Sequence, residues 1–170
     1  MTETDIALLA LRTWAGIVMI AHGIHHGRSL EGTANWFEKM GWKLPRLNAL
    51  LSSATELAIG VGLIVGLLTS VAAAALAATM LAAFWTVHRF SGFFVFRRPD
   101  EGYEYVVALA VVALALTLMG PGSASIDAAL GIDETLSGAT GAAIFGGGLL
   151  AGAGQLAALW RKPADEVKAE

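Results

Sequence analysis

Five apolar stretches of the sequence are each about as long as a membrane-spanning helix. A helix needs about 20 mostly apolar residues to cross the hydrocarbon core of a bilayer. The stretches cover roughly residues 6–24, 47–68, 71–87, 103–119 and 138–160. Of the 170 residues, 56% are hydrophobic and only 15% are charged, which is too apolar for an ordinary soluble domain. The sequence therefore predicts an all-α, polytopic transmembrane helix bundle that forms a single domain.

The fifth stretch is rich in glycine and alanine, which lowers its helix propensity, because each Gly costs about 1 kcal/mol relative to Ala. Its length and its lack of charge still favour a span. Small residues stand four apart in it, a spacing that lets helix backbones approach closely in lipid. We therefore expect a packed helix, with self-association as one use of the small residues Gly147, Gly148, Ala151 and Gly152.

The basic residues indicate the orientation of the chain. With five spans, the segments 25–46 and 88–102 and the tail lie on one side of the membrane. That side carries nearly every positive charge, namely Arg28, Lys39, Lys43, Arg46, Arg89, Arg97, Arg98, Arg161, Lys162 and Lys168. The positive-inside rule makes this side cytoplasmic. We expect a multi-pass protein of the plasma (inner) membrane, with its N-terminus outside, a cytoplasmic tail at 163–170 and a short interfacial helix within 31–43.

Arg12 and Glu56 are the two charges furthest inside the predicted spans. A charge at the centre of a transmembrane helix costs about 2.5 to 3.5 kcal/mol on insertion scales, so each should face the bundle interior. Because the first two spans run antiparallel, we predict an ion pair between them. The pair has two interpretations: a structural clamp, or a functional site in which Glu56 carries a proton or contacts a ligand.

Three histidines, His22, His25 and His26, are spaced to lie on one face of a helix. Imidazole is a common metal ligand, but a metal site needs a third or fourth ligand, for which His88 and Glu104 are the candidates. His25 and His26 are also explained as solvated residues at headgroup depth. We therefore predict no metal site, and keep His22, His25 and His26 as the candidates for one.

The chain has no cysteine, so any redox chemistry needs a bound cofactor. A b-type haem requires two histidines on different spans, and only His22 with His88 qualifies. A quinone site needs less than a haem site: hydrogen-bond partners for the quinone carbonyls, a proton path and an apolar groove. His22, His88, Glu56 and Glu104 can supply the polar groups of such a pocket. A quinone is therefore the favoured cofactor and haem the less favoured one.

The order of these motifs resembles the DoxX family over about residues 8 to 130. The matching features are Leu11-Arg12, His22-Gly23, Glu56 with Gly60 and Gly62, Gly102-Tyr103-Glu104-Tyr105, Gly120-Pro121-Gly122 and Ser125-Ile126-Asp127. The resemblance implies a small four-helix membrane protein, similar either to a quinone-reducing subunit of thiosulfate oxidation or to membrane partners of oxidoreductases in thiol and oxidative-stress balance. The residues that match are Arg12, His22, Glu56 and Glu104. The Gly-rich fifth helix departs from the family pattern.

The leading hypothesis is a membrane subunit or anchor of an oxidoreductase system that holds a quinone or a similar apolar redox ligand in an intramembrane polar pocket. Glu56, Arg12 and Glu104 are its predicted catalytic residues, and His22, His88 and Glu56 its predicted cofactor-binding residues. The alternative is a non-enzymatic scaffold or assembly factor whose Gly-rich helix docks a partner. A channel or transporter has less support, because no repeat or broken helix is visible in the spans. We expect the bilayer and other oxidoreductase subunits as partners, and no nucleic acid.

Overall fold

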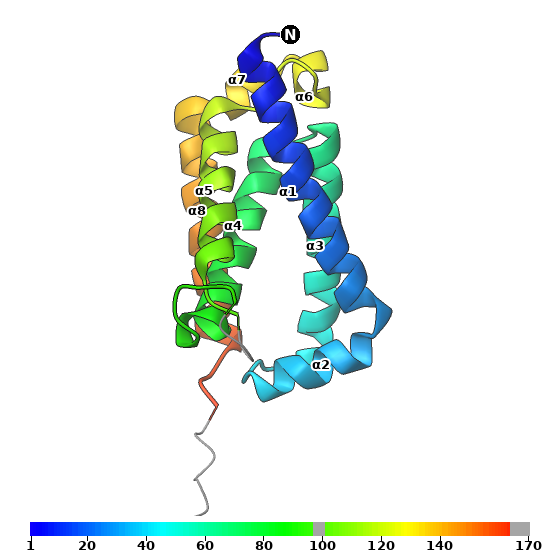
Figure 1. Cartoon of the computed structure of the whole chain (residues 1–170), viewed down its shortest axis with the longest axis vertical. Coiled ribbons are helices and arrows are strands. Elements are labelled where there is room, and N and C mark those ends of the chain that lie inside the picture. The colour runs from blue at the N-terminus through cyan, green and yellow to red at the C-terminus, as the bar shows by residue number, and fades with distance from the viewer. Residues whose placement is uncertain (97–100, 164–170) are drawn as a thin grey trace, which may run out of the picture.

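The computed structural model describes residues 1–96 and 101–163. All regular secondary structure in these residues is helical. Five long helices run alternately up and down the bundle (Figure 1): α1 (Glu3–Arg28), α3 (Pro45–Val65), α4 (Thr69–Thr86), α5 (Glu104–Met119) and α8 (Gly138–Leu159). Four of them are long and apolar enough to cross a membrane. The fifth, α5, has 16 residues and so spans only about 24 Å. The predicted all-α, multi-pass bundle is confirmed.

Shorter helices occupy the two ends of the bundle. The N-terminus lies beside α6 (Ile126–Ala129) and α7 (Asp133–Leu136) at one end, hereafter the α6 end (Figure 1). The helix α2 (Leu30–Lys39), the short helix η1 (His88–Phe90) and the last turn of α8 lie at the opposite end, the α2 end. The predicted short helix after the first span is therefore present as α2.

Apart from Arg12, the described basic residues gather at the α2 end, as the charge pattern predicts. Arg28 ends α1, Lys39 ends α2, Arg89 lies in η1 and Arg161 follows α8. Arg97, Arg98, Lys168 and the tail from residue 164 lie outside the described residues. That the α2 end faces the cytoplasm stays a prediction.

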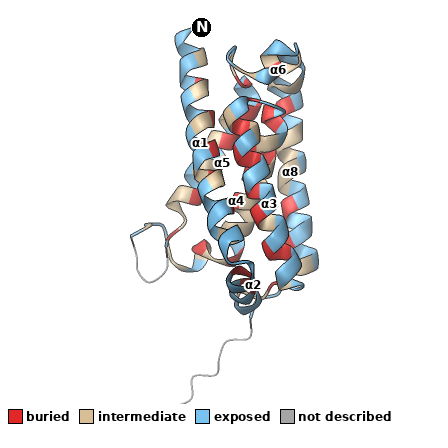
Figure 2. Cartoon of the chain, turned by 90° about the vertical axis from the view of Figure 1, so that its right-hand side faces the viewer, coloured by how far each residue is buried: buried red, intermediate tan, exposed pale blue. Residues whose placement is uncertain are grey.

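Exposed apolar side chains cover the outside of the bundle. Trp14 is 66% exposed, Val111 60% and Leu150 76%, and they lie on three different helices. Buried residues face inward between the helices (Figure 2), where Met19, Leu63, Leu76 and Leu116 form the centre of the core. An apolar exterior of this extent requires lipid around it, because a soluble monomer rarely exposes large contiguous apolar patches.

The bundle consists of two halves. In one half α1 packs along α3, and in the other α4 packs against both α5 and α8. Glycines allow the first contact: a Cβ atom on Gly16 would lie 2.8 Å from the carbonyl oxygen of Gly60, and one on Gly60 would lie 2.7 Å from that of Gly16. The two backbones therefore touch directly, which is the close approach that small residues permit in membrane helices.

Glycines also let α8 pack closely against α4. A Cβ atom on Gly148 would lie 2.6 Å from the carbonyl oxygen of Ala74, and one on Gly152 would lie 3.2 Å from the Cα atom of Ala78. Gly147 and Ala151 are exposed, and no atom lies within 4 Å of a Cβ built on Gly147. Two of the four residues predicted for self-association are thus used inside the chain.

This packing predicts opposite outcomes for two adjacent glycines. Gly148→Leu should lower the free energy of unfolding by at least about 1 to 3 kcal/mol, because the added side chain enters the α4 backbone. Gly147→Leu should be tolerated, since its side chain points away from the bundle. Thermal unfolding in detergent measures both variants. Equal stability of the two variants would contradict the close packing of Gly148 against α4.

A strap joins the halves at the α2 end. The backbone N–H of Lys43 donates to the carbonyl of Leu159 at 2.8 Å, and that of Arg161 donates to the carbonyl of Gly41 at 3.0 Å. The indole N–H of Trp160 donates to the carbonyl of Met40 at 2.8 Å. The end of α8 is therefore tied to the loop between α2 and α3.

Candidate functional site

Arg12 lies in α1 and is only 1% exposed, as a charge inside a bundle should be. Its guanidinium donates to the carbonyl oxygens of Leu63 at 2.9 Å and Ile64 at 2.5 Å, and also to that of Ala124. Leu63 and Ile64 belong to the last turn of α3, where carbonyls lack partners within the helix and carry the negative end of the helix dipole. Arg12 therefore caps the C-terminus of α3 from a neighbouring helix.

Asp127 complements Arg12 at the start of the next helix. Its carboxylate accepts from the backbone N–H groups of Leu68 at 2.7 Å and Thr69 at 2.8 Å, which are unpaired donors at the N-terminus of α4. Its own N–H donates to the carbonyl of Gly66 at 2.8 Å. Together Arg12 and Asp127 hold the turn between α3 and α4 in place, and we call this arrangement the α3–α4 clamp.

The predicted ion pair between Arg12 and Glu56 is therefore wrong. Arg12 satisfies its charge with carbonyl groups at the C-terminal end of α3, whereas Glu56 lies two to three turns earlier on the same helix and has other partners. The observed partner of Arg12 is the C-terminal end of α3. Arg12 neither neutralises nor orients Glu56.

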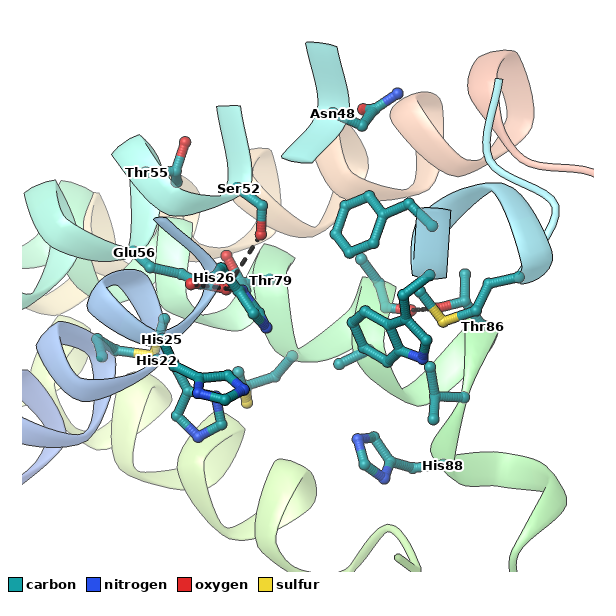
Figure 3. Close-up of a pocket in the computed structure, with 18 of the residues that line it drawn as sticks. His22, His25, His26, Asn48, Ser52, Thr55, Glu56, Thr79, Thr86 and His88 are labelled. Atoms are coloured by element: carbon teal, nitrogen blue, oxygen red, sulfur yellow. Dashed lines mark hydrogen bonds and ion pairs between the residues drawn. The ribbon is translucent and has the colours of Figure 1, made fainter. Parts of the chain in front are cut away.

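Glu56 lies instead in a cavity of about 450 Å³ between the two halves, near the α2 end (Figure 3). The cavity is walled by α1, α2 and α3 on one side and by α4, η1, α5 and α8 on the other. It contains most of the predicted polar residues: His22, His25, His26, Glu56 and His88. The structure therefore brings these five predicted residues together in one cavity.

The best-defined polar group in the cavity is a histidine–carboxylate pair. The Nδ1 atom of His26 lies 3.0 Å from one carboxylate oxygen of Glu56, and the hydroxyl of Ser52 donates to the other at 3.1 Å. The Glu56 side chain is only 6% exposed. Because a carboxylate accepts hydrogen bonds, Nδ1 carries the proton, and Nε2 of the His26 ring stays available toward the cavity (Figure 3).

A second fixed group stands on the opposite wall. The Nδ1 atom of His88 lies 2.7 Å from the carbonyl oxygen of Glu101, and its Nε2 atom lies 2.8 Å from the hydroxyl of Tyr105. The carbonyl can only accept, so Nδ1 donates and Nε2 accepts from Tyr105. Both ring nitrogens of His88 are therefore engaged. A haem held between His22 and His88 would have to break this arrangement.

Other predicted residues are placed less centrally. His22 and His25 line the cavity but are exposed. Glu104 is half-buried and does not line the cavity, whereas Glu101 and Tyr105 do. Among the described residues, no three histidine, aspartate or glutamate side chains converge as metal ligands.

Aromatic side chains form the wall at the α2 end. Phe37 stacks on Trp42 with ring centroids 5.9 Å apart, and Trp36 lies 6.0 Å from the ring of His26. Met19, Met80 and Leu109 supply further apolar surface. The cavity thus combines an apolar body with a few fixed polar groups, which is the usual composition of a small-molecule site.

Sequence reasoning missed the partners of the key residues. His26 was explained as a solvated residue, yet both His26 and Ser52 bond to Glu56. The i, i+4 spacing of Ser52 and Glu56 was a readable signal for one of these contacts. No local signal links Tyr105 to His88 or Asp127 to Thr69, because these pairs join distant segments.

This fold and this cavity define a class: polytopic helical membrane proteins with a polar site inside the bundle. The family model DoxX matches residues 7–89, which include Arg12, His26, Glu56 and His88. A Bacillus subtilis (strain 168) protein named "Putative oxidoreductase CatD" is 32% identical over 113 residues, covering 66% of this chain and 80% of that protein. The chain belongs to the DoxX family. No solved structure matches it.

Proposed function

We propose that this chain is a membrane-embedded subunit of an oxidoreductase system and that its cavity binds the ring of a quinone. The observation that supports this most is the placement of two fixed polar groups, His26–Glu56 and His88–Tyr105, on opposite walls of one largely apolar cavity. The name of the Bacillus subtilis relative agrees with a redox role.

The cavity fits such a ligand in size and in chemistry. Its volume of about 450 Å³ lies within the range of about 300 to 1,000 Å³ that small-molecule sites occupy. A quinone has a flat apolar ring with two carbonyl groups at opposite edges. The aromatic wall at Trp36, Phe37 and Trp42 suits the ring, and a protonated His26 can donate from Nε2 to one of the carbonyls.

The residues of the cavity can supply protons. A quinone takes up two electrons and two protons on reduction. With Nδ1 bound to Glu56, a protonated His26 donates from Nε2, and the Glu56 carboxylate stabilises the imidazolium charge. The chain has no cysteine thiol to supply electrons, so we assign that role to a partner subunit of the oxidoreductase system.

A titration with menadione, a tail-less naphthoquinone, tests the proposal, because a bound quinone should quench the nearby Trp36 and Trp42. We expect saturable quenching at one quinone per chain. Ala83→Phe, which fills the cavity, should weaken binding at least about tenfold through loss of ligand space, while Val111→Phe on the outer face should not. Absence of saturable quenching, or equal binding by both variants, would favour the scaffold alternative.

A further inference from the structure

The cavity has two mouths, each marked by lining residues that are exposed. Leu51 and Thr55 of α3 and Gln155 of α8 line the cavity and are exposed on one side. His22 and His25 of α1 and Glu101 before α5 do the same on the other side. Figure 3 shows Thr55 and the labelled histidines His22 and His25 on different sides of the site.

The packing of the two halves explains why the mouths lie there. The halves join through the α3–α4 clamp at the α6 end and through the strap at the α2 end. Between these two closures, few contacts connect α3 with α8 or α1 with α5. Each mouth is therefore flanked by long apolar helices and opens sideways, toward the bilayer that surrounds them.

The two mouths differ in chemistry. Among the described residues, the mouth between α1 and α5 carries the titratable side chains of His22, His25 and Glu101. The residues that line the mouth between α3 and α8 are Asn48, Leu51, Ser52, Thr55 and Gln155, none of which carries a charge at neutral pH. Charge is expensive next to hydrocarbon, so the neutral mouth is the better path for an apolar chain and the titratable mouth the better path for water and protons.

We propose that a lipid-dissolved quinone enters through the mouth between α3 and α8 and leaves its isoprenoid tail there, a proposal that rests on the proposed quinone site. The ring then lies between the His26–Glu56 pair and the His88–Tyr105 pair. The tail lies against Leu51, which is 47% exposed, and continues into the bilayer. The ligand class is thus a membrane quinone with a long tail.

One hydrogen bond closes this mouth. The side-chain amide of Gln155 donates to the Oδ1 atom of Asn48 at 3.3 Å. Asn48 is held in place, since its own amide donates to the carbonyl of Lys43 at 2.7 Å and the residue is 3% exposed. Gln155 is exposed and has only this contact to lose among the hydrogen bonds of the described residues. Gln155 therefore stands at the entrance, and rotation of its side chain breaks the one bond that crosses it.

Cross-linking each mouth separately tests the route, because the chain has no native cysteine to interfere. The double variant Leu51→Cys/Gln155→Cys, treated with a short flexible bismaleimide, closes the mouth between α3 and α8. The matched double variant His25→Cys/Glu101→Cys joins two exposed residues of the other mouth and closes it. Each single-cysteine variant, carrying the same reagent, controls for added bulk. Mass spectrometry measures completion of the cross-link.

Loading of long-tailed menaquinone from liposomes is then compared with loading of menadione from water. Closing the mouth between α3 and α8 before menaquinone is added should slow loading at least about tenfold, since access limits the association rate. Closing it after loading should slow release to a similar degree. Closing the mouth between α1 and α5 should leave menaquinone loading unchanged, and menadione should still bind in both cross-linked proteins.

The outcomes separate this inference from the proposed function. If the unmodified protein binds neither quinone, the quinone site itself is wrong. If it binds both, and the cross-link between α3 and α8 leaves menaquinone loading unchanged, the route is wrong while the site stands. Block by the cross-link between α1 and α5 alone would also overturn the route, because the tail would then pass the titratable mouth.

Discussion

Arg12→Leu is expected to lower the free energy of unfolding by about 3 to 5 kcal/mol, because it leaves several carbonyl groups without a donor at about 1 to 3 kcal/mol for each one that is buried. The change strips the donor from three carbonyl groups at the end of α3 and in the segment before α6. Buried acceptors left without a partner keep the full cost of desolvation. The variant should therefore fail to accumulate or should unfold at a much lower temperature in detergent.

Two control variants test whether the loss of the Arg12 contacts causes this destabilisation. Arg28→Leu removes an exposed arginine from the other end of the same helix and should leave the unfolding temperature nearly unchanged. Arg12→Lys keeps the charge but lacks the planar fork that reaches several carbonyls at once, so it should recover only part of the stability. If Arg12→Leu is as stable as Arg28→Leu, the clamp does not hold the turn between α3 and α4.

Glu56→Gln is expected to slow the reduction of bound menadione by dithionite about a hundredfold, at the lower end of what general acid–base catalysis contributes. Glutamine has nearly the same shape but no negative charge to stabilise protonated His26 across their 3.0 Å contact. Stopped-flow absorbance measures the rate on protein saturated with the quinone. The binding step is followed separately by tryptophan quenching, so a defect in affinity is not mistaken for one in proton transfer.

Glu101→Gln is the matched control, because Glu101 also lines the cavity but is exposed and contributes only its backbone carbonyl to His88. Its reduction rate should stay close to that of the unmodified protein. Unfolding temperatures of both variants check that the fold is intact. If Glu56→Gln binds menadione and dithionite reduces it there at the normal rate, the charge of Glu56 does not assist proton transfer and Glu56 serves only to hold His26.

Much of the site could be predicted because buried charge is costly wherever it occurs. That rule identifies Glu56 and Arg12 without any knowledge of their neighbours. It cannot identify the partners, since a buried guanidinium is satisfied equally by a carboxylate or by several carbonyls. The choice of the carbonyls of Leu63 and Ile64 depends on where α1 crosses α3, which is set by the contact between Gly16 and Gly60.

The sequence by itself determined the membrane class, the helical fold and the segregation of basic residues to one end. Each of these follows from the length and composition of a local segment. Only the tertiary structure decided that Gly148 faces α4 while Gly147 faces outward, and that Glu101 and Tyr105 line the cavity while Glu104 does not. Adjacent residues on a helix point about 100° apart, at 3.6 residues per turn, so such choices depend on how neighbouring helices are rotated and packed.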